Sequence, residues 1–384
     1  MRIIDKVFAF TLGTFALLFI GVPLGFIALI AVMPVYSYFI FSLVAILYIV
    51  IGMISFGFFK TKRRKQVTGI VVIVLLAVPG IPSLLQLYKD NIETVASEIN
   101  IHDYAPFTEG SAVKSLDEEA ALTLEGELPV LDGATAMYPL YSAFVQAVYP
   151  ENSAYHEEGT VRASTTPYAY ENLFNGEADI IFAAAPSENQ IKLAERMGVK
   201  LQMTPIGREA FVFFVNKKNP VDGLTLEQIR GIYAGKSTSW SEVGGKEEDI
   251  RAFQRPEDSG SQTALQNLMG DTPIMEAPKE DIVSGMGGII REVAQYKNYK
   301  NAIGYTFRYY STEMVGNDEI KLLAIDGVAP TKENIRNGTY PIASEFYAVT
   351  AGTDNPNVPK LLEWILSTQG QALVEKVGYV PLSE

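Results

Sequence analysis

Three long apolar stretches without a charged side chain dominate the N-terminal part of the chain. They cover about residues 7–33, 35–59 and 67–88, and each reaches the roughly 20 residues that a helix needs to cross a hydrocarbon core. This pattern predicts a membrane domain over residues 1–88 with three transmembrane helices. Core helices of a soluble protein are the alternative, but three in succession would leave little polar surface for water. A cleaved signal peptide is disfavoured because the runs are long and repeated.

A different pattern follows the apolar region. Residues 89–127 mix charged, small, proline and glycine residues without apolar periodicity and predict a linker. From residue 128 onward, short apolar runs alternate with amphipathic helical patterns, which predicts an α/β domain over residues 128–384. The predicted strands lie at 128–131, 179–183, 210–216 and 346–350, and the predicted helices at 138–148, 167–175, 188–197, 225–233, 261–269, 286–295 and 357–377.

The size of this α/β region predicts two lobes. Lobe 1 covers about residues 128–206 and 345–384, and lobe 2 covers about 207–344. The chain is expected to cross between them near 204–208 and 340–345. The overall prediction is therefore a two-lobed α/β domain preceded by three membrane helices.

The basic residues predict the orientation of the chain in the membrane. Arg2 and Lys6 precede the first apolar run, and a basic cluster at 60–65 separates the second from the third. By the positive-inside rule, the N-terminus and this cluster are cytoplasmic, and residues 89–384 are extracytoplasmic. Contact of the basic cluster with anionic lipid is compatible with the same topology. The protein is expected in the cell membrane as a multi-pass protein with lipid as a partner.

Charge and composition narrow the function of the exported region. The chain has a formal net charge of −13, and because residues 1–88 contain seven basic residues and one acidic residue, the remainder carries −19. Such an acidic surface argues against nucleic acid as a partner. The chain has no cysteine, which excludes disulfides, thiol catalysis and a lipid-modified cysteine. Any anion must be held by local dipoles and a few focused cations.

One segment has the composition of an oxyanion site. Arg255 precedes the Ser259, Gly260, Ser261 triplet, which opens a predicted helix. An arginine fork matches two oxygens, a glycine permits close backbone approach, and a helix N-terminus offers unpaired N–H groups. Two further predicted helices begin after small polar residues, at Thr135 and at the run from Ser164 to Pro167. Each of these residues alone is more often an ordinary helix cap.

Ordered motifs in the second half of the α/β region resemble the periplasmic phosphate-binding protein family. They are Asn216 to Val221, Leu224 to Ile229, Ile232 to Lys236, Trp240 to Gly245, Ala302 to Tyr305 and Thr339 to Ile342. The resemblance covers about residues 128–384 and leaves the membrane region outside it. It implies a PstS-like, type II periplasmic-binding-protein fold, in which two lobes close over a tetrahedral oxyanion and deliver it to an ABC importer.

The resemblance also implies a set of ligand-binding residues. At positions that match the family, these are Thr135 with the adjoining Ala136, Ser164 with Thr165, Arg255, Ser259, Gly260 and Ser261. Glu257 matches a carboxylate that steadies the arginine, and Asp258 is the neighbouring alternative.

One position departs from the family pattern. Ala184 stands where members that discriminate phosphate carry an aspartate ahead of an Ala-Pro pair. That carboxylate accepts the proton of hydrogen phosphate and repels sulfate, which has no proton to donate, so its absence weakens the argument for phosphate over sulfate. The other acceptors that the sequence offers are Glu157, Glu158 and Glu188.

The sequence therefore predicts a membrane-anchored, extracytoplasmic oxyanion receptor, with inorganic phosphate as the leading ligand and ABC permease subunits as partners. No cofactor, metal or catalytic residue is expected. A hydrolase with Ser259 or Ser261 as nucleophile needs a base, and the chain has only His102 and His156. A sensor or membrane interaction protein that keeps the binding fold without transport is the second alternative, because three spans exceed what an anchor needs.

Overall fold

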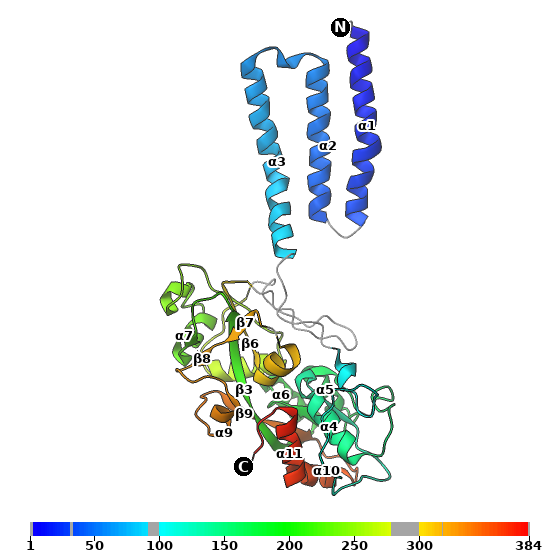
Figure 1. Ribbon diagram of the computed structural model, residues 1–384, viewed down its shortest axis with the longest axis vertical. Helices are drawn as coiled ribbons and strands as arrows, with labels where there is room; N and C mark the ends of the chain where they lie inside the picture. Colours follow the sequence, from blue (N-terminus) through cyan, green and yellow to red (C-terminus); the bar gives the residue numbers. More distant parts are fainter. Residues whose placement is uncertain (1–2, 31–33, 91–99, 278–298, 317, 383–384) are drawn as a thin grey trace. The chain divides into compact units, whose positions relative to one another are not determined.

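The computed structural model describes residues 3–30, 34–90, 100–277, 299–316 and 318–382 (Figure 1). The chain forms two compact units, Met1–Ile92 and Glu93–Glu384. The second unit therefore contains most of the predicted linker together with the α/β region.

The first unit consists of long helices. They are α1 (Ile3–Ile30), α2 (Pro34–Ser55) and α3 (Lys62–Asp90), with a short 3₁₀ turn at Phe58–Lys60. By length and composition, one segment of the described residues can cross a membrane, Ile3–Leu24, while the apolar segment Ile40–Ser55 is shorter. The prediction of three spans therefore goes further than the described residues support: three helices form, but one qualifies as a candidate span.

The second unit is built on one mixed sheet. In the described residues its strand order is β1-β2-β9-β3-β6-β5, with β7 paired to β3. The strands are β1 (Leu131–Gly133), β2 (Ile180–Ala183), β3 (Gln202–Asn216), β5 (Arg251–Ala252), β6 (Ala302–Phe307), β7 (Ile320–Leu322) and β9 (Ala343–Thr350). A separate parallel pair joins β4 (Gly223–Leu224) and β8 (Ala324–Ile325).

Apart from α9, which no pattern predicts, the described helices of the second unit form close to where the amphipathic patterns place them. They are α4 (Tyr138–Val148), α5 (Thr165–Phe174), α6 (Glu188–Met197), α7 (Leu226–Tyr233), α8 (Gly260–Met269), α9 (Lys332–Arg336), α10 (Val358–Leu366) and α11 (Thr368–Val377). The single helix predicted at 357–377 is divided at Ser367, whose extended backbone (ψ 169°) ends α10 and whose side chain caps α11. The helix predicted at 286–295 lies outside the described residues.

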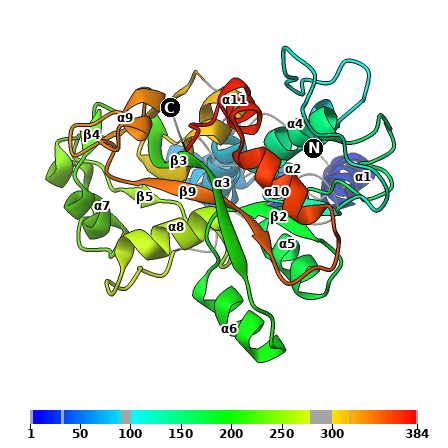
Figure 2. The same cartoon turned by 90° about the horizontal axis from the view of Figure 1, so that it is seen from below.

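Two main hydrophobic cores lie on either side of the long strands. Tyr141, Phe182 and Trp364 belong to the core beneath α4 and α10, which we call the first lobe together with α5, α6, α11, β1 and β2. Phe213 and Trp240 belong to the core of the second lobe, which contains α7, α8, α9, β5, β6 and β7. Figure 2 shows β3 and β9 running between these two groups of helices.

The strands β3 and β9 join the lobes. They pair antiparallel, and their register shifts between Pro205 and Gly207. A side chain at Gly207 would overlap the ring of Phe346, so glycine permits the close approach of the two strands there. The bulge lies within the segment where the sequence predicts the first lobe crossing.

Residues 100–127 differ from the predicted linker because they pack onto the first lobe. Ile101 and Leu124 are buried in its core, and the Leu124 amide donates to the carbonyl of Val148 at 2.8 Å. The Asn357 amide donates to the carbonyls of Glu125 and Glu127, each at 2.8 Å. These contacts are irregularly spaced, so they leave no periodic signal in the sequence.

Candidate functional site

A buried carboxylate organises the end of β1. Asp132 is fully buried, and its Oδ1 accepts hydrogen bonds from the amides of Gly133 (2.7 Å) and Ser164 (2.8 Å). Its Oδ2 accepts from the side chain of Asn172 at 2.7 Å. The carboxylate therefore joins the turn after β1, which carries Thr135 and Ala136, to the start of α5.

Helix α5 begins two residues earlier than the predicted start at 167. Thr166 resembles an N-cap followed by a first-turn Pro167, but the cap residue is Ser164 and the helix begins at Thr165. Thr165 has φ 73°, which is strained for a β-branched residue. Thr166 is thereby buried and turned toward α8.

The start of α8 closes against this turn. Ser259 is its N-cap: the hydroxyl donates to the carbonyl of Pro256 at 2.8 Å and accepts from the amide of Gln262 at 3.4 Å. A Cβ on Gly260 would lie 3.3 Å from Thr166 Oγ1 and 3.8 Å from the Cβ of Ala184. Glycine therefore lets the N-terminus of α8, in the second lobe, approach α5 and the end of β2 in the first lobe.

The guanidinium of Arg255 lacks the partners that a buried cation needs. Its Nε and Nη1 are buried and have no hydrogen-bond partner among the described residues. The backbone is well held, because its amide donates to Gln262 Oε1 (3.1 Å) and the hydroxyl of Tyr305 (2.9 Å). Since a buried N–H group without a partner is costly, the two unpaired guanidinium nitrogens of this half-buried arginine indicate an anion site.

Neither acidic neighbour steadies Arg255. Glu257 is exposed, and no ion pair joins it or Asp258 to Arg255 in the part of the chain that the structure describes. The predicted role of Glu257 is therefore not seen. Asp258 instead accepts hydrogen bonds from Ser187 Oγ (2.6 Å) and Asn189 Nδ2 (3.3 Å) at the start of α6. It holds the Arg255 loop against the first lobe.

Replacing Asp258 with alanine is expected to weaken anion binding by about threefold to tenfold. The variant loses the contacts that link the lobes, each contributing about 0.5–1.5 kcal/mol, while Arg255 remains. Isothermal titration of the full-length protein with phosphate measures the change, with the exposed Asp326→Ala as a matched control at another positive-φ aspartate. An unchanged affinity would show that the link does not contribute to binding.

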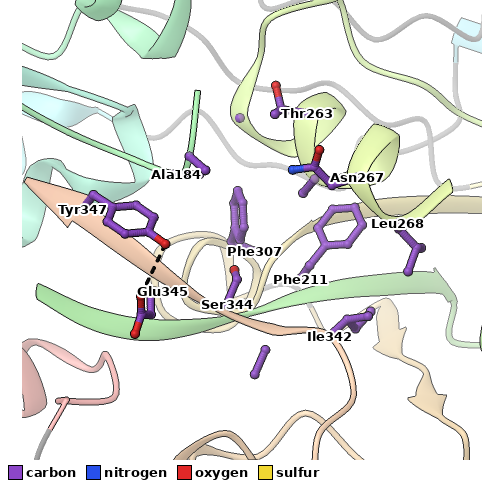
Figure 3. Close-up of a pocket in the computed structure, with 14 residues that line it drawn as sticks. Ala184, Phe211, Thr263, Asn267, Leu268, Phe307, Ile342, Ser344, Glu345 and Tyr347 are labelled. Atoms are coloured by element: carbon purple, nitrogen blue, oxygen red, sulfur yellow. Dashed lines mark hydrogen bonds between the residues drawn. The ribbon is translucent and has the colours of Figure 1, made fainter. Parts of the chain in front are cut away.

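Two adjoining cavities lie between the lobes. A small cavity of about 30 Å³ is lined by Ala136, Thr166 and Glu209 among others, and a larger one of about 210 Å³ lies against α8. Five residues line both cavities: Ala184, Gly260, Phe307, Ser344 and Glu345. Figure 3 shows the larger cavity, with the hydroxyl of Tyr347 pointing to the carboxylate of Glu345.

The cavities bring together only part of the predicted residue set. Ala136 and Gly260 line a cavity, whereas Thr135, Ser164, Thr165, Arg255, Ser259 and Ser261 line neither. Ala184, where the resemblance implies the missing aspartate, lines both cavities. Sequence reasoning missed Thr166 as a lining residue, and it missed Phe307, Ser344 and Glu345. Ser344 and Glu345 fall in the predicted lobe crossing at 340–345. That crossing is the one sequence signal that could have identified them.

A buried ion pair stands at the base of the small cavity. Glu209 Oε1 lies 3.7 Å from Arg308 Nε, and both side chains are buried. Glu209 also accepts from the amides of Ala210 (2.8 Å) and Tyr309 (3.1 Å), and Arg308 Nη2 donates to the carbonyl of Gly378 at 2.7 Å. Burial raises the pKa of Glu209 to about 7, although Arg308 and the two amides oppose the shift.

This shift predicts that stability falls as pH rises. The folded pKa of Glu209 is about 7 against an ordinary 4.5, so its contribution is fully present below pH 4.5 and is lost toward pH 7, about 3 kcal/mol in all. Glu209→Gln is expected to flatten this part of the profile. Urea unfolding followed by tryptophan fluorescence measures it, because Trp240 and Trp364, the two tryptophans, both lie in the second unit. A fall that persists in the variant would assign it to another group.

The chemistry of a hydrolase is not assembled at Ser259. Its hydroxyl donates to a backbone carbonyl, and the two histidines pack edge-to-face with each other, their ring centroids 4.5 Å apart. His156 Nδ1 is hydrogen-bonded to Tyr138 at 2.8 Å, and its pKa is lowered by burial and by His102. No group of His, Cys, Asp or Glu suited to a metal occurs in the described residues.

Two hydrophobic cores on either side of β3 and β9 give this unit a two-lobed α/β fold. A model of the PBP superfamily domain matches residues 127–369, so the chain belongs to the PBP superfamily. The chain is 25% identical over 255 residues to the phosphate-binding protein PstS of Bacillus subtilis, covering 66% of this chain and 80% of that protein. It is 26% identical over 275 residues to protein SphX of Synechococcus elongatus, covering 66% and 77%.

Solved structures are similar at a lower level. An ABC-type phosphate transport receptor from Vibrio cholerae aligns with a TM-score of 0.47 and 19% identity over 65% of this chain and 98% of that chain.

Proposed function

We propose that this protein is a membrane-anchored, extracytoplasmic solute-binding protein that captures a tetrahedral oxyanion, inorganic phosphate foremost, for an ABC importer. Two buried guanidinium nitrogens of Arg255, Nε and Nη1, which have no hydrogen-bond partner among the described residues, carry the proposal. The names of the relatives, phosphate-binding protein PstS among them, support phosphate as the ligand.

In this proposal the anion binds where the start of α8 faces the start of α5. Arg255 donates through its fork, and the amides after Ser259 and the hydroxyl of Ser261 donate from α8. Thr135 and Ser164 donate from the first lobe. Because the donors come from both lobes, the anion stabilises the closed arrangement, and no covalent step is required.

The N-terminal unit is the proposed anchor. The candidate span Ile3–Leu24 supports an anchored protein, and α2 and α3 are proposed as two further spans. The basic cluster at 60–65 supports a cytoplasmic N-terminus and an extracytoplasmic binding domain. Cysteine labelling in intact cells tests this, since the native chain has no cysteine: single cysteines at Thr61 and at Ser241 are expected to be protected and labelled, respectively.

Calorimetry tests which anion the protein binds. The full-length protein in detergent is titrated with phosphate and with sulfate, and heat of binding is expected for phosphate. A folded protein that gives no heat with either anion would contradict the proposed function.

Replacing Ala184 with aspartate is expected to raise the preference for phosphate over sulfate by about tenfold or more. The residue lines both cavities, so a carboxylate there would accept the proton of hydrogen phosphate and repel sulfate. The ratio of the two dissociation constants measures the effect. Ala184→Asn is the control, because asparagine has nearly the same shape as aspartate but carries no charge. A ratio that does not change would show that the side chain at 184 does not meet the anion.

A sensor that keeps the binding fold without transport is a second candidate. The three-helix first unit is larger than a single anchor requires, which favours contact with a membrane partner. Phosphate uptake by cells that lack the gene separates the two: unimpaired uptake with an altered phosphate response would favour the sensor.

A further inference from the structure

We propose that the larger cavity holds the organic substituent of a monosubstituted phosphate or phosphonate whose anionic group sits in the oxyanion site. This inference rests on the proposed function and defines its ligand class. It follows from the joining of the two cavities, the absence of a carboxylate at Ala184, and the chemistry of the cavity walls.

The two cavities are continuous in their lining. Ala184 and Gly260 border both of them, and Gly260 opens the helix whose N-terminus faces the anion. A group attached to one oxygen or to the phosphorus of the anion would therefore enter the larger cavity directly. The volume of the larger cavity, about 210 Å³, leaves room for a substituent of several non-hydrogen atoms.

The alanine at 184 suits such a ligand. A phosphate monoester or a phosphonate carries two negative charges when fully ionised and then has no P–OH proton to donate. A carboxylate at 184 would repel this dianion, whereas a methyl group neither repels it nor occupies the space. Ala184 weakens the argument that the site discriminates phosphate from sulfate. The same residue favours a phosphate monoester or a phosphonate as the ligand.

The residues that line the larger cavity indicate the chemical character of the substituent. Phe211 and Phe307 contribute apolar surface, while Asn267 and Thr263 line the cavity from α8. Figure 3 shows the Asn267 amide extending toward the space between Ala184 and Phe307. The Thr263 hydroxyl oxygen is buried and lacks a partner among the described residues, so this wall has unused hydrogen-bonding capacity. A short substituent with hydroxyl groups fits this mixture.

Glu345 sets the charge of the substituent. Its carboxylate belongs to an exposed residue that borders both cavities, and it accepts a hydrogen bond from the Tyr347 hydroxyl at 3.3 Å. A second acidic group in the cavity would face this charge. The substituent is therefore uncharged or cationic.

The test compares inorganic phosphate, glycerol 3-phosphate and phosphoglycolate by calorimetry on the full-length protein. Glycerol 3-phosphate, with an uncharged substituent, is expected to bind about tenfold tighter than inorganic phosphate because additional surface is buried. Phosphoglycolate, with an acidic substituent, should gain no such advantage. Glycerol 3-phosphate that binds no tighter than phosphate would overturn the inference and leave the proposed function intact. Absence of binding by all three would contradict both.

Cavity-filling variants locate the substituent. Asn267 is exposed and lines only the larger cavity, so Asn267→Phe is expected to remove the advantage of glycerol 3-phosphate without changing phosphate affinity. Asn267→Leu should remove part of it. Gln266→Phe, on the same helix but outside the cavity lining, is the matched control. An advantage that survives Asn267→Phe in a folded protein would place the substituent elsewhere and overturn the inference.

Discussion

Replacing Arg255 with alanine is expected to weaken phosphate binding by at least about thirtyfold. The variant removes the buried cation of the site, and truncating one partner of a desolvated, hydrogen-bonded charge pair costs about 2–5 kcal/mol or more. The same variant should leave the ligand-free protein as stable as the native one or more so, since Nε and Nη1 have no partner among the described residues. Loss of affinity without loss of stability is the signature of a ligand-binding arginine.

Two controls accompany this prediction. Arg255→Lys keeps the charge but loses the planar fork. Its affinity for phosphate should therefore fall between those of the native protein and of the Arg255→Ala variant. Arg196→Ala removes an exposed arginine of α6 and should change nothing. Calorimetry gives the affinities, and urea unfolding followed by tryptophan fluorescence gives the stabilities. If Arg255→Ala destabilised the protein while binding phosphate normally, Arg255 would be a structural residue and the site would lie elsewhere.

Replacing Arg308 with leucine is expected to destabilise the second unit by about 3–5 kcal/mol, because it leaves Glu209 buried without its cation. Arg308 also donates to the carbonyl of Gly378 and to Thr312, and these bonds are lost with it. The effect should be smaller near pH 5, where Glu209, with a pKa of about 7, is protonated and carries no charge. Urea unfolding at pH 5 and pH 8 measures the difference.

A surface ion pair of the same protein provides a control for the Arg308→Leu variant. Arg336 pairs with Glu375 where both side chains are partly exposed, and Arg336→Leu should cost less than about 1 kcal/mol. Combining Arg308→Leu with Glu209→Gln should recover part of the lost stability, because the uncompensated charge is removed. Equal losses of stability in the Arg308→Leu and Arg336→Leu variants would mean that burial does not strengthen the pair of Arg308 with Glu209.

Local features of the site were readable from the sequence, because they depend on neighbours in the chain. The Ser259, Gly260 pair predicts a capped helix start, and α8 begins there. The Asn175, Gly176 pair predicts the end of α5, where Gly176 adopts φ 74°. By contrast, the three spans predicted from apolar length exceed the one candidate span of the described residues.

The contacts between distant segments could not be read in this way. The family resemblance implies that Glu257 steadies Arg255, yet the fold turns Glu257 to solvent and directs Asp258 to α6. Residues 100–127 pack on the first lobe through scattered apolar residues. No local pattern encodes either arrangement, since each depends on which surface the rest of the chain presents.

The sequence by itself determined the alternation of helices and strands, the placement of an arginine ahead of a glycine-containing helix start, and the absence of an acid at Ala184. Tertiary structure alone decided that Gly260 meets Thr166 and Ala184 across the lobes and that Nε and Nη1 of Arg255 are buried without partners among the described residues. It also decided that a second cavity adjoins the site. The physical reason is that hydrogen bonds of caps and turns are made within a few residues, whereas burial and cavities arise only where elements remote in sequence pack together.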